Sequence, residues 1–316
     1  MALGGLLKLD VLKHFLPLTR YPYVGRQIAC PVCGEPPATP IAGLDRRLKR
    51  LPTVACPACG LLFTNPMPTE AELETYYEQL YRFDYQMAAQ EPSNKHVRKR
   101  TNEAEGRIAD LEGLLPANAR TLDFGCGSGE LVEQLTALAY DAHGFEPGTA
   151  YGQYARRKLG ERIRIACWQA VDYAGPFDLV SCFHVLEHLR DPIAALQRIV
   201  QWLKPAGLAY LEVPDMGIRD RNKGFGGLHF AHVLGFNHYN LLLAAAIVGL
   251  QPKRVISGTG IIFQKGDVQG DTMASQDGDL ARKGARLTAE LYSRGEAYRN
   301  YLRYQASKFR LRRRAS

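Results

Sequence analysis

One short stretch constrains the fold more than any other, Arg-Thr-Leu-Asp-Phe-Gly-Cys-Gly-Ser-Gly-Glu at residues 120–130. An apolar strand runs into a glycine-rich turn, and a helical pattern follows. Gly125, Gly127 and Gly129 lack a Cβ, so the backbone can bend sharply there and approach a ligand closely. A helix that begins at such a turn presents free N–H groups and the positive end of its dipole. The stretch therefore predicts a strand–turn–helix unit that binds an anionic group.

Two acidic residues extend this prediction. The dinucleotide fingerprint is G-x-G-x-x-G, whereas the spacing here is G-x-G-x-G, with Glu130 at the sixth position. Asp123 lies two residues before the first glycine, where it can order the turn and reach a ligand amine. Glu146 ends the next predicted strand, 141–146, where it can accept two ribose hydroxyls. NAD sites also carry an acidic residue about 20 residues after the glycine turn. These residues alone therefore do not distinguish this site from a nucleotide-binding domain.

Two further segments complete a pattern. Phe-Asp-Leu-Val-Ser-Cys-Phe-His-Val-Leu-Glu-His-Leu-Arg-Asp-Pro at 177–192 is typical of a strand and a following helix, and Leu-Lys-Pro-Ala-Gly-Leu-Ala-Tyr-Leu-Glu-Val-Pro at 203–214 of a turn and a strand. Together with the glycine turn they resemble the class I S-adenosylmethionine-dependent methyltransferases over roughly 120–265. The resemblance implies an enzyme whose cofactor is S-adenosylmethionine. The cofactor-binding residues it implies are Asp123, Gly125, Gly127, Gly129, Glu146 and Phe183.

Predicted strands and helices alternate through this region. The helices are expected at 129–139, 148–159, 191–203 and 238–248, and the strands at 162–166, 177–183, 207–213, 252–257 and 260–265. Alternation with glycine turns favours a parallel sheet covered by helices on both faces, a Rossmann-like doubly wound α/β fold. Ligands of such sheets bind at the carboxyl ends of the strands, where Asp123, Glu146 and His184 fall.

Four of the seven cysteines form two matched C-x-x-C-G knuckles. Cys30 and Cys33 belong to the first knuckle, and Cys56 and Cys59 to the second. Four thiolates in this pattern are typical of a tetrahedral Zn²⁺ site, and a fully protein-ligated ion has no open position for catalysis. We therefore expect a structural zinc ribbon at 28–68. A redox pair is the alternative, which the presence of two matched knuckles disfavours.

The segments around the ribbon carry weaker signals. Leu6, Leu9 and Leu12 predict a short amphipathic helix within 1–27, which would cap the fold or rest on a membrane surface. The basic run 45–50 is expected to form a solvated hairpin, with contact to an acidic substrate as the alternative. The polar stretch 91–100 is expected to be a crossing loop, followed by a helix over 102–115.

The segment Thr-Glu-Ala-Glu at 69–72 predicts a capping box that opens a helix. Tyr76, Tyr77 and Tyr81 follow on this helix. Their spacing is typical of core residues. In the superfamily that the chain resembles, such a helix can instead cover the cofactor.

The end of the chain changes in composition. Gly, Asp, Gln and Ser mark a linker at 266–278, after a methyltransferase domain expected at 69–265. The tail 279–316 is predicted to be a basic helix that binds RNA or an anionic membrane surface, or that packs against the domain. Its basic residues include Arg294, Arg299, Arg303, Lys308, Arg310, Arg312, Arg313 and Arg314.

Composition restricts function only weakly. A hydrophobic content of 46% and a charged content of 23% are ordinary for a globular protein. The net charge of +8 permits nucleic acid, anionic lipid or acidic glycans as partners and selects none of them. The longest apolar run, 241–250, is too short to span a bilayer and predicts a buried helix. The N-terminus lacks the pattern of a secretory signal, and scattered cysteines fit a reducing compartment, so a cytoplasmic location is expected.

Histidines are the candidate catalytic residues. Methyl transfer is an in-line displacement, so an enzyme positions the acceptor and, where needed, removes its proton. His184 and His188 lie four residues apart, on one face if that segment is helical, and His188 resembles the histidine of the "LEH" element of small-molecule methyltransferases. A structural role is the alternative for each.

A second histidine cluster occupies Gly-Leu-His-Phe-Ala-His-Val-Leu-Gly-Phe-Asn at 227–237. It is similar to the "E-H-x-x-x-F-S" element of sugar and natural-product methyltransferases that carry an N-terminal zinc ribbon. The resemblance implies that His232 is a general base, Phe236 the aromatic residue and Asn237 a helix cap. Ala231 replaces the usual Glu, so a structural His232 is the alternative.

The expected function is S-adenosylmethionine-dependent methyl transfer to a sugar, glycan precursor or secondary metabolite, at oxygen, nitrogen or carbon. The alternative is an RNA methyltransferase whose ribbon and basic tail bind phosphates. The segment 181–184, Ser-Cys-Phe-His, lacks the Asn/Asp-Pro-Pro-aromatic motif of enzymes that methylate base amino groups. A binding module with a degenerate site is disfavoured by the intact Asp123, glycines and Glu146.

Overall fold

The computed structural model of the chain describes residues 16–36, 40–80, 91–217, 227–266, 273–293, 295–296, 298–303 and 306. The leucines on which the helix within 1–27 was predicted lie outside these residues, and so does Tyr81. No helix among the described segments has both the length and the apolar character needed to cross a membrane.

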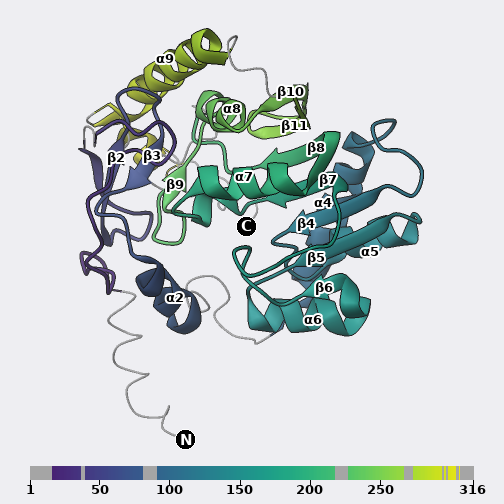
Figure 1. Cartoon of the computed structure of the whole chain (residues 1–316). Helices are drawn as coiled ribbons and strands as arrows, with labels where there is room; N and C mark the ends of the chain where they lie inside the picture. Colours follow the sequence, from purple (N-terminus) through teal and green to yellow (C-terminus); the bar gives the residue numbers. More distant parts are fainter. Residues whose placement is uncertain are drawn as a thin grey trace, which may run out of the picture.

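A seven-stranded sheet with the order β10-β11-β8-β7-β4-β5-β6 forms the centre of the molecule (Figure 1). Its strands are β4 Arg120–Phe124, β5 Asp141–Phe145, β6 Ile163–Arg164, β7 Phe177–Phe183, β8 Leu203–Glu212, β10 Leu250–Val255 and β11 Gly260–Lys265. The five strands from β8 to β6 are parallel. From β4 the chain first adds β5 and β6 on one side of β4, and then returns to add β7 on the opposite side of β4. The strand order thus switches between β4 and β7, where doubly wound sheets bind their ligands. The predicted α/β class is confirmed.

The edge of the sheet differs from the all-parallel expectation. β11 pairs antiparallel with both β8 and β10. A connection of four residues, 256–259, joins β10 to β11, and so short a turn permits only antiparallel pairing, because a parallel return needs a dozen or more residues.

Helices cover both faces of the sheet. Successive side chains of a strand point to opposite faces, and the apolar ones leave both faces of the sheet to be covered. α7 Pro192–Trp202 and α8 His238–Ile247 pack in one core with Phe124 and Val180. α5 Glu130–Ala137 and α6 Thr149–Leu159 contribute to a separate core with Ala142 of β5. The apolar run at 241–250 is a buried helix over most of its length, as predicted.

α4 Asn94–Asp110 corrects the prediction of a crossing loop at 91–100. The Ser93 side chain accepts a hydrogen bond from the His96 N–H at 3.3 Å and caps the helix. Lys99 and Arg100 pair with Glu103 one turn later. A polar helix of this kind relies on its cap and on such pairs rather than on an apolar stripe, so hydrophobic periodicity misses it.

A second sheet, β1-β2-β3-β9, joins the N-terminal region to the segment after the fifth parallel strand. Its strands are β1 Pro40–Leu44, β2 Arg50–Ala55, β3 Leu62–Thr64 and β9 Leu234–Gly235. Leu62 lies opposite Gly235, and the Thr64 N–H donates to the Val233 carbonyl at 2.9 Å. The cysteine-rich region therefore shares a sheet with the segment that carries His232.

The basic run 45–50 does form the β1–β2 hairpin, and Arg50 is exposed as expected, but two of the charged residues are not solvated. Asp45 and Lys49 are fully buried. Asp45 accepts a hydrogen bond from the Tyr21 hydroxyl, and Lys49 Nζ donates to Thr19 Oγ1 at 2.7 Å. Segment 16–36 packs over the hairpin and satisfies these charges, which a pattern of charged residues alone cannot reveal.

α2 Glu70–Gln79 begins at the predicted capping box, where Thr69 and Glu72 exchange hydrogen bonds. Tyr76 is buried and packs against the rings of Tyr21 and Phe230, as expected for a core residue. Tyr77 instead points its hydroxyl toward His188.

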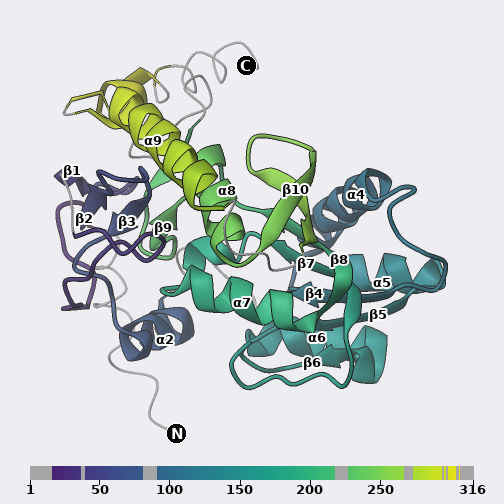
Figure 2. The same cartoon turned by 45° about the horizontal axis from the view of Figure 1, so that its top comes forward.

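α9 Met273–Tyr292 lies across α8 and the β1-β2-β3-β9 sheet (Figure 2). It begins within the predicted linker 266–278. Asn237, at the start of α8, donates to Thr288 Oγ1 at 3.1 Å, and Thr288 donates to the Gly60 carbonyl at 2.7 Å. The described part of the tail thus packs against the domain, while Arg294 and 307–316 lie outside the described residues.

Candidate active site

The glycine turn follows β4 at the switch point of the sheet. Gly125, Gly127 and Gly129 have φ values of 75°, 54° and 85°, which side chains rarely allow. A Cβ on Gly125 would lie 2.6 Å from Val185 Cγ2, whereas a Cβ on Gly127 would meet nothing within 4 Å. Gly125 therefore lets the turn pack against 184–188, and Gly127 leaves open space beside the backbone for a ligand.

Glu146 connects the turns that follow β4 and β5. Its Oε2 accepts from the Gly127 N–H at 3.1 Å and its Oε1 from the Gly148 N–H at 2.8 Å. Burial raises the pKa of Glu146, and these two donors oppose the rise. Each carboxylate oxygen can accept a further hydrogen bond, so the predicted contact with ribose hydroxyls fits this geometry.

Asp123 lies at the end of β4 with its side chain buried. Its Oδ1 accepts from Ser181 Oγ at 2.7 Å, and Ser181 sits directly opposite on β7. Burial raises the pKa of Asp123 to about 6. Sequence reasoning missed Ser181, although aligning the two predicted strands by their carboxyl ends would have placed it beside Asp123.

Phe183 ends β7 and packs against Arg107 and Tyr210. The Arg107 guanidinium lies 3.8 Å from the centre of the Phe183 ring, and the Tyr210 ring lies at 4.8 Å. The contact of Phe183 with the cofactor stays a prediction.

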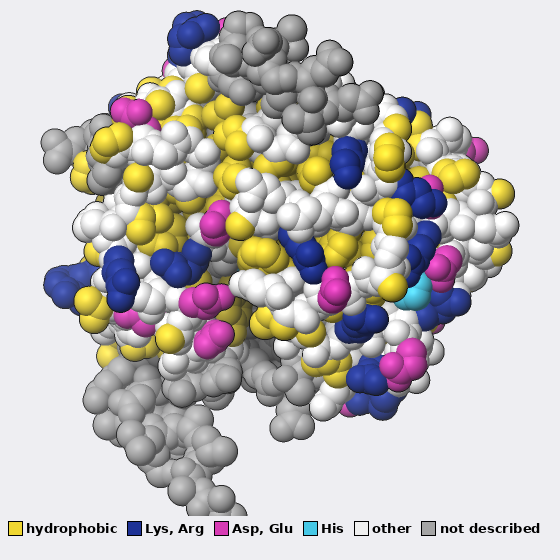
Figure 3. Space-filling model, viewed as in Figure 1, with side chains coloured by type: hydrophobic (Ala, Val, Ile, Leu, Met, Phe, Trp, Pro, Cys, Tyr) yellow, Lys and Arg dark blue, Asp and Glu magenta, His cyan; other side chains and the backbone are white. Residues whose placement is uncertain are grey.

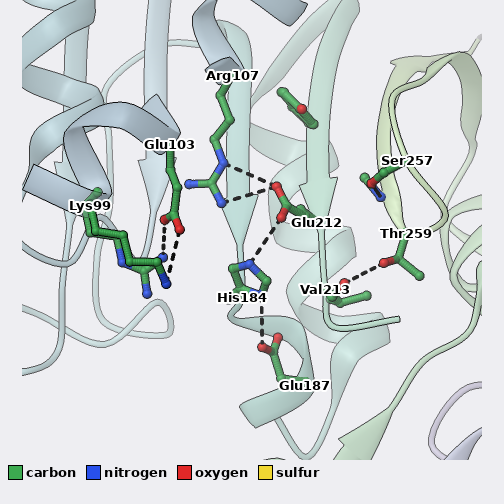
Figure 4. Close-up of polar contacts among 12 residues, drawn as sticks. Lys99, Glu103, Arg107, His184, Glu187, Glu212, Val213, Ser257 and Thr259 are labelled. Carbon is green, nitrogen blue, oxygen red and sulfur yellow. Dashed lines mark hydrogen bonds and ion pairs between the residues drawn. The ribbon is translucent and has the colours of Figure 1, made fainter. Parts of the chain in front are cut away.

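His184 belongs to a chain of alternating charges at the same edge (Figure 4). Its Nε2 lies 3.2 Å from Glu212 Oε1, and its Nδ1 lies 3.7 Å from Glu187 Oε1. Arg107 pairs with the other Glu212 oxygen at 3.2 Å. Burial lowers the pKa of His184, but Glu187 and Glu212 outweigh it and raise the pKa to about 9. His184 is therefore protonated near neutral pH, where it can act as a cation or an acid but not as a base.

His188 lies in a short 3-10 turn, Leu186–His188, so the α-helical arrangement considered for 184–188 does not form. Its Nδ1 lies 2.8 Å from both the Ala231 carbonyl oxygen and the Tyr77 hydroxyl. Placing the N–H on Nδ1 avoids setting a lone pair against that carbonyl, so we assign this tautomer. Burial lowers the pKa of His188, which leaves a neutral ring with a bare Nε2.

His232 reaches the same point from the acceptor-side segment. Its ring lies 4.7 Å from the His188 ring and 3.9 Å from the His229 ring, centre to centre. Burial lowers its pKa well below the ordinary value, and His229 and His188 add to the effect. The structure thus brings His184, His188 and His232 together around Glu187, a buried carboxylate that sequence reasoning did not single out although it stands inside the quoted LEH element.

Residues 96–248 match the family model described as a methyltransferase domain. The matched stretch, a little under half of the chain, is therefore similar to methyltransferase domains. The ubiquinone biosynthesis O-methyltransferase of Xanthomonas axonopodis pv. citri is 33% identical over 105 residues, which cover 31% of this chain and 44% of the relative. The enzyme of the same name from Escherichia coli O127:H6 is 33% identical over 109 residues, 32% of this chain and 45% of the relative. The chain spans less than half the length of these curated relatives.

Two solved structures of low sequence identity are similar to part of this chain. Magnesium protoporphyrin IX methyltransferase from Synechocystis is 16% identical with a TM-score of 0.45, over 62% of this chain and 98% of that one. An amino pentose methyltransferase from Micromonospora echinaspora is 20% identical with a TM-score of 0.37, over 60% of this chain and 96% of that one.

The four knuckle cysteines converge beside the methyltransferase domain. The Sγ atoms of Cys30 and Cys59 are 3.7 Å apart, and those of Cys33 and Cys56 are 3.5 Å apart. Zn–S bonds of about 2.3 Å in a tetrahedron place the sulfurs about 3.8 Å apart, so the four thiols fit this ion. Among the described residues, the group that could hold this ion consists of the four cysteines alone.

Proposed function

We propose that this chain transfers the methyl group of S-adenosylmethionine to a small-molecule acceptor, and that Cys30, Cys33, Cys56 and Cys59 hold one structural zinc ion. One observation carries the first proposal. The glycine turn packs through Gly125 directly against Val185, which lies within the histidine-bearing segment 184–188. The glycine turn and the histidine cluster therefore adjoin at one edge of the sheet.

The cofactor-side residues would bind and orient S-adenosylmethionine. When bound, it supplies a methyl group on a positively charged sulfur, which departs with the electrons of the broken bond as the acceptor takes the methyl group. Glu146 would accept the ribose hydroxyls, Asp123 would receive the amine, and the glycine backbone would allow close approach. Phe183 would line the same site.

The histidine cluster would position the acceptor and receive its proton. His232 is neutral because of its burial, so it can accept a proton when a reacting group is present. His188 would hold the acceptor beside it, with its ring oriented by the Ala231 carbonyl. His184 would supply positive charge next to the reacting atoms.

A small acceptor fits this site better than a polymer. The side chains of His188 and His232 are only 20% and 22% exposed. On the face in Figure 3, basic side chains are interspersed with acidic ones in the described residues rather than gathered in one patch. The relatives matched by sequence are named as O-methyltransferases of ubiquinone biosynthesis, which supports an oxygen acceptor on a small molecule. A sugar, glycan precursor or secondary metabolite fits the same description.

Methyl incorporation from labelled S-adenosylmethionine tests this proposal. The purified full chain would be offered nucleotide sugars, phenolic metabolites and total RNA in parallel. Label should enter a small-molecule fraction, and Asp123→Ala should abolish it together with cofactor binding measured by calorimetry. Asp141→Ala, which changes an exposed acid on the neighbouring strand, is the matched control. Label that enters RNA alone would refute the small-molecule acceptor.

A further inference from the structure

We propose that Glu187, His188 and His232 form a second metal site, which binds a divalent first-row transition metal ion at the acceptor edge. Among the described residues, their ligand atoms form one of two groups able to hold an ion, the other being the cysteine cluster. Histidine nitrogen and carboxylate oxygen suit such ions, and the set of two histidines and one carboxylate leaves coordination positions open.

The first argument is the state of Glu187. Its side chain is 2% exposed, yet neither carboxylate oxygen has a hydrogen-bond partner. A buried carboxylate in this condition is strongly destabilising unless it is paired or coordinates a metal. His184 is the nearest described cation, but its Nδ1 is 3.7 Å away and its Nε2 approaches Glu212 more closely, at 3.2 Å. The Glu187 oxygens thus remain available to an ion.

The second argument is the direction of the histidine lone pairs. With the N–H of His188 on Nδ1, its bare Nε2 faces Glu187 Oε1 at 3.8 Å. Two acceptors that face each other repel unless a proton or a cation lies between them. Metal-binding histidines commonly donate the opposite N–H to a backbone carbonyl, and the Ala231 carbonyl takes this part here.

The third argument is spacing. His232 Nε2 approaches the same Glu187 oxygen, Oε1, at 3.9 Å. Ligands bound at about 2.1 Å in a tetrahedron lie about 3.4 Å apart, so each histidine nitrogen is within about half an ångström of that separation from the Glu187 oxygen. All three ligand atoms lie within 4.8 Å of one another.

A metal ion at this site would take part in the proposed methyl transfer, and this catalytic role rests on the proposed function. With an ion bound, His232 would be a ligand rather than the base. The open positions would take an acceptor hydroxyl, and the cation would lower its pKa so that its proton passes to solvent water. The site selects acceptors with an ionisable oxygen.

Titration of the zinc-loaded full chain with Co²⁺ tests the site without any assay of activity. Calorimetry should show one additional equivalent. The visible spectrum should lack the intense sulfur-to-cobalt bands that binding at the cysteines would produce. Glu187→Gln and His232→Asn should each weaken this binding by more than the roughly 10- to 100-fold that loss of an outer partner typically costs. His143→Gln, a histidine on β5 outside the cluster, should leave it unchanged.

Thermal unfolding of each variant shows whether it folds, and His188→Asn replaces any variant that does not. Absence of the additional equivalent at millimolar Co²⁺ would overturn the site. Equal Co²⁺ binding by wild type and the ligand variants would also overturn it. Because the measurement needs no cofactor, a chain that binds Co²⁺ at this site but fails to bind S-adenosylmethionine would contradict the proposed function and keep the metal site.

Discussion

The cofactor half and the acceptor half of this site are built in different ways. Asp123, the glycine turn and Glu146 come from one continuous stretch of 24 residues, 123–146, within which Gly127 donates to Glu146. A side-chain bond to a distant strand joins Ser181 to Asp123. The acceptor half combines α2, the turn at 184–188, the segment 229–232 and the end of β8, which lie far apart in the sequence. A local unit can tolerate damage elsewhere in the fold, whereas an assembled one depends on every element that supports it.

The sharpest test of this difference is loss of the cysteine cluster. Cys59→Ser should remove stoichiometric zinc and disturb β3, which pairs with β9 next to His232. Methyl transfer should fall by about a hundredfold or more, because a misplacement of about 1 Å near a reacting centre has that effect. Affinity for S-adenosylmethionine should stay close to wild type. Parallel loss of both would show that the two halves are not independent. Cys167→Ser, an exposed cysteine outside the cluster, is the control.

The cofactor half should respond to acid through Asp123. Its pKa of about 6 means that the folded protein without ligand protonates this acid below pH 6. A protonated carboxyl no longer attracts an amine, so affinity should fall about tenfold per pH unit below 6. The unfolded chain keeps the ordinary pKa, so between pH 6 and 3.8 this group favours folding as the pH falls. Calorimetry at pH 5 and 7.5 measures the effect, and Asp123→Asn should remove the pH dependence.

The contact between α8 and α9 offers a smaller test. Asn237→Ala removes the cap of α8 and the bond to Thr288, and should destabilise the fold by about 1–2 kcal/mol in urea unfolding. Ser93→Ala removes the more exposed cap of α4 and should have the smaller effect. Equal effects would show that the bond to Thr288 adds nothing.

The smallest change is expected at His184. Glu212→Gln removes one of the two carboxylates that raise its pKa, so the pKa should fall from about 9 toward or below the ordinary 6.5. An NMR titration of the histidine ring protons measures this shift, and Glu103→Gln on α4 is the control. An unchanged titration near pH 9 would assign the whole effect to Glu187.

The same contrast explains what the sequence could predict. Asp123, Glu146 and the four cysteines could be predicted as site residues because their expected roles depend on short spacings along the chain. The role of Glu187 and the contact of Tyr77 with His188 were missed, because only the folded chain brings α2 to the turn at 184–188. Likewise, the burial of Asp45 and Lys49 depends on Tyr21 and Thr19, which lie 24 and 30 positions away. Polar residues carry no periodic pattern that predicts such partners.

The bond from Asn237 through Thr288 to Gly60 has a consequence for how such chains can be recombined. In the sequence, the cysteine-rich region has clear boundaries, so it could be taken for a unit that can be exchanged between related proteins. In three dimensions it shares a β-sheet with β9, next to His232, and α9 packs against it where Gly60 approaches Gly284. A chimaera that exchanges this region alone should inherit a mismatched acceptor pocket, so the smallest transferable unit comprises the cysteine-rich region, the segment 227–247 and α9 together.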